Sequence, residues 1–400
     1  MSPPVRELLD LVFRWMHLIA GIMWIGNSLL WNWLDRNLEP SRTDKEGIAG
    51  DIWLLHSGAF YFMEKDLRGW DRGRPLHWFK WQAYTTWLTG AALLVVVYYA
   101  SGGALLIDPA VRELSPAAAI GIGAGTIVGG WLAYDLFLGR AVSRMGRMGA
   151  VAALALVLAL AFGLTQVFSG RAAFLHVGAL LGTLMAGNVF RVIMPAQRVL
   201  VSAVERGERP DPGPAKRAKD RSIHNNYMTF PVLVLMLSSH FPALYGHRWN
   251  WLVLGILVVT GAAVRHILNV RFGWPRWKPA LAATFAASLG TLALLTARPA
   301  QSRAAADAGG GPVSFAQANA VIQKRCAVCH SADAADRTFG VAPAGVAFDT
   351  PEQIRSRMDR IRARAVETQT MPPANRTHMT TEERALLGRW IAQGGRMDAQ

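Results

Sequence analysis

Long apolar runs alternate with short polar stretches over the first three quarters of the chain. Eight runs hold about the 20 apolar residues that one helix needs to cross a membrane, near residues 11–34, 81–100, 116–138, 148–168, 173–195, 227–245, 250–270 and 279–297. The first run is too long and too rich in Trp for a cleaved signal peptide, and no small-residue cleavage site follows it. The pattern predicts an all-α fold in which residues 1–297 form an eight-span transmembrane bundle.

The polar segments predict further elements of the bundle. The first loop is long, 35–80, and its part 51–65 mixes aromatic with polar residues as an interfacial amphipathic helix does. The loop 196–226 contains three prolines and a glycine between 210 and 214, which predicts an exposed turn. Glycines recur every fourth residue at 121, 125 and 129, and this stripe predicts close packing against a neighbouring helix.

The last part of the chain has the pattern of a small helical domain. Residues 298–312, RPAQSRAAADAGGGP, predict a flexible linker before a domain at 313–400. Helices are expected at 315–326, 352–366 and 381–394, the last one capped by Thr380 or Thr381 with Glu383 close behind. Five arginines between 355 and 364 form either a solvated face or a docking patch for an acidic redox partner.

The strongest chemical signal is the motif Cys326-Ala-Val-Cys329-His330, which holds the only two cysteines of the chain. This is the spacing of covalent haem c attachment, in which two thiols bind the porphyrin and the histidine binds the iron. The chain has too few cysteines for a structural zinc site of the Cys₄ or Cys₃His type. No βαβ pattern surrounds the motif, as it would in a thioredoxin-like redox site. The motif therefore predicts one haem c.

A second axial ligand is expected because the iron of cytochromes c is commonly held by His and Met. Met371 stands in a loop that Pro372 and Pro373 stiffen by fixing φ, and we favour it. Met358 and Met379 are its competitors, and Met358 fits better as the core side of a helix.

Composition and charge decide where the chain resides. It is 52% hydrophobic and only 17% charged, too apolar for an ordinary soluble protein. A net charge of +15 would suggest nucleic acid if the arginines formed one face, but they fall between apolar runs, so no nucleic-acid partner is expected. Lys and Arg crowd the loops after runs one, three, five and seven, which the positive-inside rule assigns to the cytoplasm. Both termini and the haem domain then face the periplasm of a bacterial inner membrane, where haem c is attached.

Histidines inside membrane spans are functional candidates by default. His17 and His176 fall in the outer half of the bundle, and each precedes a Gly-x4-Gly-Asn stretch. The small residues leave a slot for a flat porphyrin, so the two histidines are candidate ligands of a haem b. Such a haem would help electrons cross a hydrocarbon core of about 30 Å. The alternative is two hydrogen-bonded histidines in a glycine-rich interface.

Polar residues gather where runs two and six begin. His77 and Lys80 open run two, and His224 and Asn225 open run six. A cation, an amide and proton carriers beside aromatic rings would suit a flat anion, so these four residues are the candidate catalytic residues. The alternative is an interfacial aromatic belt with a snorkelling Lys80.

These motifs together resemble one family, the membrane-bound urate hydroxylases that join a multi-span domain to a C-terminal cytochrome c. The resemblance rests on the haem motif and on five membrane stretches, Arg14–Gly26, His77–Trp87, Ala186–Pro195, His224–Pro231 and Ser239–Pro242. It implies oxidation of urate to 5-hydroxyisourate in purine catabolism, with electrons passed through haem to the cytochrome domain. A soluble cytochrome or a terminal oxidase would then accept them. The resemblance supplies no catalytic residues, so the four candidates rest on the pattern alone.

Two other functions are compatible with the same pattern. The bundle could anchor an electron-relay cytochrome that has no substrate of its own. It could also be a transporter or sensor, although such proteins typically have paired repeats with broken helices. Reduction of the haem by urate would distinguish the enzyme from both.

Overall fold

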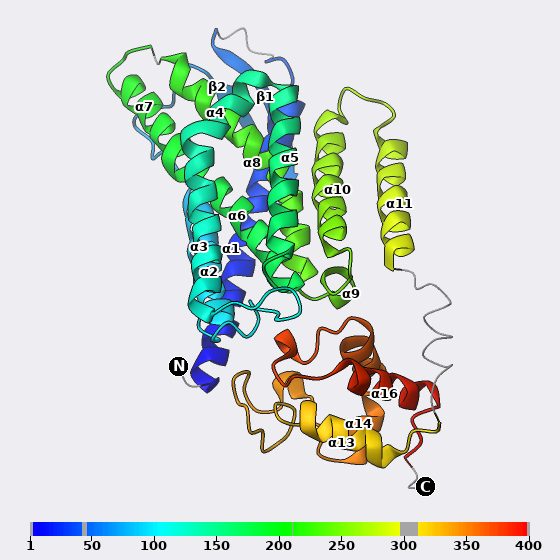
Figure 1. Ribbon diagram of the computed structural model, residues 1–400. Helices are drawn as coiled ribbons and strands as arrows, with labels where there is room; N and C mark the ends of the chain where they lie inside the picture. Colours follow the sequence, from blue (N-terminus) through cyan, green and yellow to red (C-terminus); the bar gives the residue numbers. More distant parts are fainter. Residues whose placement is uncertain (1–2, 42–45, 210, 297–310, 398–400) are drawn as a thin grey trace.

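A bundle of long helices and a separate group of short helices make up the molecule (Figure 1). The computed structural model describes residues 3–41, 46–209, 211–296 and 311–397. Most of the predicted linker, 298–312, lies outside these ranges. The bundle elements in chain order are α1 (Pro3–Asn37), α2 (Trp81–Leu93), η1 (Leu94–Tyr99), α3 (Pro116–Ala133), η2 (Tyr134–Leu138), α4 (Gly139–Met145), α5 (Arg147–Thr165), α6 (Gly170–Asn188), η3 (Val189–Ile193), α7 (Met194–Glu205), α8 (Pro212–Ser238), α9 (Pro242–Tyr245), α10 (Asn250–Val270) and α11 (Trp277–Thr296).

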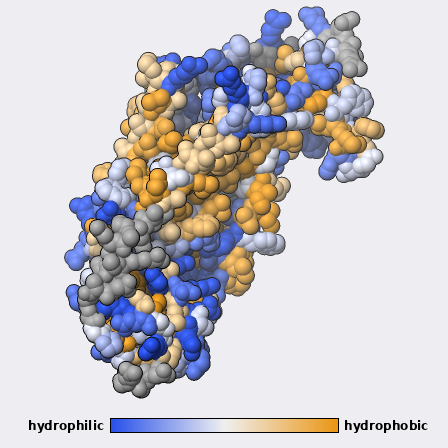
Figure 2. Space-filling view, turned by 90° about the vertical axis from the view of Figure 1, so that its right-hand side faces the viewer, coloured by the Kyte–Doolittle hydropathy of each residue, from blue (hydrophilic) through white to orange (hydrophobic). Residues whose placement is uncertain are grey.

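Six of the described helices are long and apolar enough to cross a membrane: Val5–Asn37, Pro116–Met145, Arg147–Thr165, Gly170–Glu205, Asn250–Val270 and Trp277–Leu295. Many of their apolar side chains are exposed, and the space-filling view shows a broad hydrophobic band between hydrophilic ends (Figure 2). Such a surface is stable when it faces lipid rather than water. The other two predicted spans are also helical, in α2 with η1 and in the second half of α8, and the count of eight spans stays a prediction.

The amphipathic helix expected at 51–65 is wrong, because this stretch is an antiparallel β-hairpin of β1 (Ile48–His56) and β2 (Ala59–Asp66). Ser57 and Gly58 connect the strands with φ of 52° and 75°, and two positive φ values in a two-residue loop match the right-handed twist of a hairpin. Trp53 pairs with Phe62 across the strands, with ring centroids 4.8 Å apart. The described fold is therefore not purely α-helical.

Two smaller expectations for the bundle differ from the structure. The expected loop 196–226 is mostly helical, because α7 continues to Glu205 and α8 begins at Pro212 behind the N-cap Asp211, and among the described residues the exposed turn is confined to a short stretch at 206–209. Proline suits the first helical turn, where its missing N–H is not needed. The glycine stripe 121–129 does not mediate packing, since an added Cβ at its three positions would meet nothing within 4 Å. Gly123 permits close helix packing instead, because an added Cβ at this position would lie 2.7 Å from the ring of His176.

The centre of the bundle is α6, whose side chains pack against α3, α5 and α8. Phe168, Phe174 and Leu235 are almost completely buried there. Neighbouring α8 and α10 approach so closely that a Cβ on Gly261 would lie 2.7 Å from the backbone nitrogen of Pro231. Glycine permits this contact, which holds the polar residues of α8 and α10 side by side.

The C-terminal unit consists of α13 (Phe315–Arg325), η4 (Pro343–Gly345), α14 (Pro351–Ser356), α15 (Met358–Ile361), η5 (Arg362–Glu367), η6 (Pro373–Asn375) and α16 (Thr381–Ala392). The first and third predicted helices are confirmed as α13 and α16, and Thr380 is the N-cap of α16. The single helix expected at 352–366 is wrong, since the chain leaves helical geometry at Arg357. Ile322, Leu387 and Trp390 form the core of this unit.

The C-terminal unit lies at the end of the bundle where α1 begins (Figure 1). The guanidinium of Arg6 in α1 lies 5.7 Å from the ring centroid of Phe339. A second contact lies beside α9, where an added Cβ on Gly246 of the bundle would lie 2.8 Å from the carbonyl oxygen of Thr368 in the C-terminal unit. The N-terminus and the C-terminal unit therefore share one end of the bundle, and the β-hairpin occupies the other.

Candidate functional site

The haem motif follows directly after α13, and its backbone holds the histidine in one orientation. The amide of His330 donates to the carbonyl oxygen of Cys326 at 2.9 Å. The imidazole Nδ1 lies 3.0 Å from the carbonyl oxygen of Val346, so Nδ1 must carry the proton. Nε2 is then an unprotonated lone pair, which is the form that binds a metal.

The two thiols of the motif do not have the lowered pKa of a reactive redox pair. Both are free, and burial raises the pKa of Cys326 to about 12 and also raises the pKa of Cys329. Reactive cysteine pairs need a lowered pKa, because the thiolate is the nucleophile and the metal ligand. Within the described ranges, no three His, Cys, Asp or Glu side chains gather in a way that could hold a metal ion. The donor set therefore fits haem c better than zinc or disulfide chemistry.

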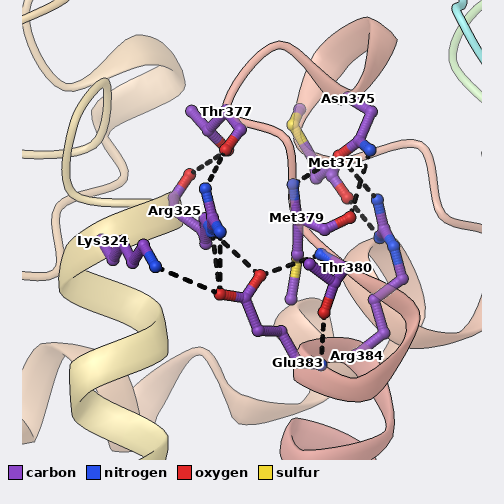
Figure 3. Close-up of polar contacts among 9 residues, drawn as sticks. All are labelled: Lys324, Arg325, Met371, Asn375, Thr377, Met379, Thr380, Glu383 and Arg384. Carbon is purple, nitrogen blue, oxygen red and sulfur yellow. Dashed lines mark hydrogen bonds and ion pairs between the residues drawn. The ribbon is translucent and has the colours of Figure 1, made fainter.

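The structure separates the three methionines considered for the axial position. Met379 is 3% exposed and belongs to the domain core, and the thioether of Met358 packs against Gly395 and that core. Met371 is only half-buried, and its carbonyl oxygen accepts from Nη1 of Arg384 at 2.8 Å. In the view of Figure 3, the thioether of Met371 lies near the top and the thioether of Met379 lies lower, toward Glu383. Cys326, Cys329, His330 and Met371 thus fit haem c.

The two membrane histidines each have their own protein partners. Nδ1 of His17 lies 2.9 Å from the carbonyl oxygen of Thr86, and its ring packs on Gly90, whose added Cβ would lie 2.9 Å away. His176 is fully buried, with Nδ1 2.8 Å from the carbonyl oxygen of Ala172 and Nε2 3.1 Å from the Tyr99 hydroxyl.

Both ring nitrogens of His176 are thus engaged, and no contact among the described residues joins its ring to that of His17. A bis-histidine haem needs the Nε2 atom of each ring facing one iron. This arrangement does not fit a haem b between His17 and His176, so that haem stays a prediction.

A buried polar network connects η2, α6 and α8. The hydroxyl of Tyr134 lies 2.7 Å from Nδ1 of His224 and accepts from Nδ2 of Asn188 at 3.1 Å. Asn188 also donates to Oδ1 of Asn225 at 2.8 Å, and Asn225 donates to the carbonyl oxygen of Met185 at 3.0 Å. Two of the four candidate residues, His224 and Asn225, are therefore joined through a tyrosine and an asparagine. The pattern missed Tyr134 because it lies in the middle of an apolar run.

Nε2 of His224 faces the hydroxyl of Ser143 at 3.5 Å, and Ser143 donates its own proton to the carbonyl oxygen of Gly139 at 3.0 Å. The proton of His224 therefore belongs on Nε2, and Nδ1 accepts from Tyr134. Arg221 lies beside this pair, its guanidinium 4.6 Å from the centroid of the Tyr134 ring and its Nη1 buried with no described partner. The network can hold or pass a proton in a positively charged surrounding.

The opposite side of α8 carries a second polar group. Oδ1 of Asn226 accepts from Nε of Arg265 at 3.0 Å and from Nδ2 of Asn269 at 2.7 Å. Arg265 lines a cavity of about 370 Å³ between α1, α8 and α10. Arg265 and Asn269 were not among the residues predicted for a site. Their polar side chains inside the apolar run 250–270 are nevertheless a signal of a functional site that the sequence contains.

The other two candidate catalytic residues lie apart from these groups. His77 is exposed in the segment before α2, and Lys80 is the N-cap of α2 with its ammonium 5.9 Å from the centroid of a Trp81 ring. No hydrogen bond of the described chain connects either residue to His224 or Asn225. Their catalytic role stays a prediction.

The comparisons with known proteins give one match. The model of a family described as urate oxidase N-terminal matches residues 3–297. No curated protein and no solved structure matches the chain. The matched range ends where the helical bundle ends, before the unit that carries the haem motif.

Proposed function

The chain belongs to the urate oxidase N-terminal family, and from this premise we propose that its bundle oxidises urate and passes the electrons to haem c in the C-terminal unit. The reaction is the addition of one water to urate with loss of two electrons and two protons, which gives 5-hydroxyisourate. The observation that carries the proposal is the fusion, in one chain, of a bundle matched over residues 3–297 with a unit that contains the motif Cys326-Ala-Val-Cys329-His330.

The bundle supplies groups for the proton transfers. Oxidation of urate releases protons into the bundle, and the pair formed by Tyr134 and the unprotonated Nδ1 of His224 supplies a group that can take one up. Asn188 donates to the Tyr134 hydroxyl and is held in turn by Asn225, which is the positioning that acid–base catalysis needs. His77 and Lys80 remain candidates for binding urate as it enters from the surface.

The C-terminal unit supplies the electron acceptor. When bound, haem c takes up one electron at a time, so two transfers are needed for each urate. Cys326 and Cys329 would hold the porphyrin covalently, and Nε2 of His330 and the thioether of Met371 would bind the iron. A soluble cytochrome or a terminal oxidase would then take the electrons from the exposed side of this unit.

The location proposed for the protein is the bacterial inner membrane, with the apolar helices in the bilayer. The distribution of Lys and Arg among the loops supports cytoplasmic placement of the β-hairpin end. The shared position of the N-terminus and the C-terminal unit supports periplasmic placement of the opposite end.

Anaerobic addition of urate to the purified full-length protein tests the proposal. We expect urate alone to reduce haem c, seen as growth of the ferrous absorbance bands, with two haems reduced for each 5-hydroxyisourate formed. Ascorbate serves as the control that haem c can be reduced. Reduction by ascorbate without any by urate would reject the enzyme and favour an electron relay without its own substrate. A pyridine haemochrome spectrum of the same sample would show whether haem b accompanies haem c.

A further inference from the structure

We propose that the cavity beside Arg265 is the binding site for the urate anion, a deepening that rests on the proposed function. The cavity has a volume of about 370 Å³ and lies between α1, α8 and α10. This volume falls within the range of about 300–1,000 Å³ that small-molecule sites occupy. Its lining combines apolar walls with a few polar groups, Asn32, Arg265 and Arg271.

Arg265 carries a buried positive charge beside this cavity, with one hydrogen-bond donor left unpaired. The residue is 2% exposed, and its Nη2 has no partner among the described residues. No carboxylate of the described chain lies within ion-pair distance of Arg265 or of Arg271. A buried charge without a counter-charge is costly, and inside a membrane bundle it marks a functional site by default. An anion in the cavity would provide the missing charge.

The guanidinium is fixed in position before any ligand arrives. Its Nε donates to Asn226, whose carbonyl oxygen is held in turn by Asn269. Its plane lies near the Phe230 ring, with the guanidinium carbon 5.4 Å from the ring centroid. A preorganised donor loses less conformational entropy on binding, which favours affinity.

The lining also indicates the shape of the anion. Phe230 and Trp33 place aromatic rings in the lining, which suits a flat ligand, and the positive charge of Arg265 favours an anion. Arg271 adds a second positive charge, and Asn32 adds an amide that can both donate and accept. A planar, singly charged purine such as urate meets all of these groups. A neutral purine would leave the charge of Arg265 uncompensated.

Binding measurements on the full-length protein in nanodiscs of zwitterionic lipid test this assignment. The probes are urate and the neutral purine hypoxanthine, followed by isothermal titration calorimetry. We expect wild-type protein to prefer urate, and Arg265→Gln to weaken urate binding at least about tenfold. Arg276→Gln is the matched control, because Arg276 is exposed and does not line the cavity. It should bind urate as the wild type does.

Leu30→Trp provides a variant that leaves the polar groups intact, since Leu30 lines the cavity and is 46% exposed. We expect the added bulk to weaken urate binding about tenfold while the thermal stability stays unchanged. Unchanged urate affinity in either Arg265→Gln or Leu30→Trp would overturn the cavity assignment, even if the wild type oxidises urate. Displacement of urate by added phosphatidylglycerol without any purine preference would instead assign the site to lipid and overturn it. If wild-type protein neither bound nor oxidised urate, the proposed function itself would fail.

Discussion

Removal of the Glu383 carboxylate should loosen the segment that carries the haem motif. Arg325, the residue before Cys326, donates through Nε and Nη2 to both oxygens of Glu383 at 2.9–3.0 Å. Their side chains are only 14% and 17% exposed. Thr377 donates to the carbonyl oxygen of Arg325 at 3.0 Å (Figure 3). Arg325 thus ties the end of α13 to the start of α16 through the Glu383 carboxylate, and to the loop after Met371 through Thr377.

The expected magnitude follows from burial and geometry. Removing one partner of a buried ion pair costs about 3–5 kcal/mol, because the other charge stays without compensation. Glu383 also completes the capping box of α16, with Oε2 accepting from the Thr380 amide at 2.8 Å, an effect of about 1 kcal/mol. Both effects act through the same carboxylate and are not simply additive. We therefore expect Glu383→Ala to destabilise α13 and α16 by about 3–5 kcal/mol.

Hydrogen–deuterium exchange with mass spectrometry on the full-length protein measures this effect locally. At about 1.4 kcal/mol per factor of ten, amides of α13 and α16 should exchange roughly 10²- to 10³-fold faster in Glu383→Ala. Lys324→Ala is the control, because its ammonium lies 3.8 Å from the same carboxylate but its side chain is 65% exposed. Exposed pairs contribute at most about 1 kcal/mol. Equal exchange rates in the two variants would refute the assignment of stability to the buried pair.

Three other predictions concern the axial ligand, acid stability and helix packing. Met371→Leu should abolish the signature of thioether ligation in the magnetic circular dichroism of ferric haem c. Met379→Ala should retain that signature and lower the free energy of unfolding in denaturant by about 2–5 kcal/mol, because Met379 is a buried core residue. The reverse result would make Met379 the ligand. Burial raises the pKa of Glu383, but its hydrogen bonds and its ion pair with Arg325 outweigh this and hold the pKa below the ordinary value of a glutamate side chain. Its stabilisation is thus complete above the unfolded pKa and lost as pH falls through the folded one. The protection factors of α16 amides, which correct each exchange rate for the intrinsic rate at that pH, should therefore fall in acid in the wild type and fall less in Glu383→Gln; an identical acid response would contradict this. Gly261→Ala should destabilise the bundle by about 1–3 kcal/mol, because the added Cβ would meet the backbone of α8. Gly290→Ala should not lower the melting temperature, because the space around Gly290 is open. Similar melting temperatures of these two variants would disprove the close contact at Gly261.

Features that depend on neighbours in the sequence could be predicted from it. The bounds of α13 and α16 follow from helical periodicity, and Thr380 and Glu383 form the expected capping box. The four residues proposed for haem c are also local in the sequence, because the motif at Cys326–His330 is contiguous and Met371 stands in a proline-rich loop; their role stays a prediction. The hairpin 48–66 was missed although it is local. Its Ser57-Gly58 turn is less distinctive than Asn-Gly, and its aromatic residues were assigned to an interfacial helix.

Features that depend on which helices become neighbours could not be predicted in the same way. Asn225 and Asn226 are adjacent in the sequence, but they lie on different sides of α8. Asn225 contacts α6 and belongs to the network of His224, and Asn226 contacts α10 and positions Arg265. The sequence shows that both are polar residues near a membrane interface. Only the packing of α8 between α6 and α10 separates them into a proton network and a candidate anion site.

The position of the cavity restricts how electrons can reach the C-terminal unit. Arg6 contacts that unit, whereas Leu29 lines the cavity, and both belong to α1. At 1.5 Å per residue, the two positions are about 35 Å apart along this helix. That span exceeds the hydrocarbon core of about 30 Å and is far longer than one electron hop. If urate is oxidised beside Arg265, the bundle must therefore hold a carrier between the two ends. A haem count of one per chain, found together with urate binding in the cavity, would require a carrier other than haem.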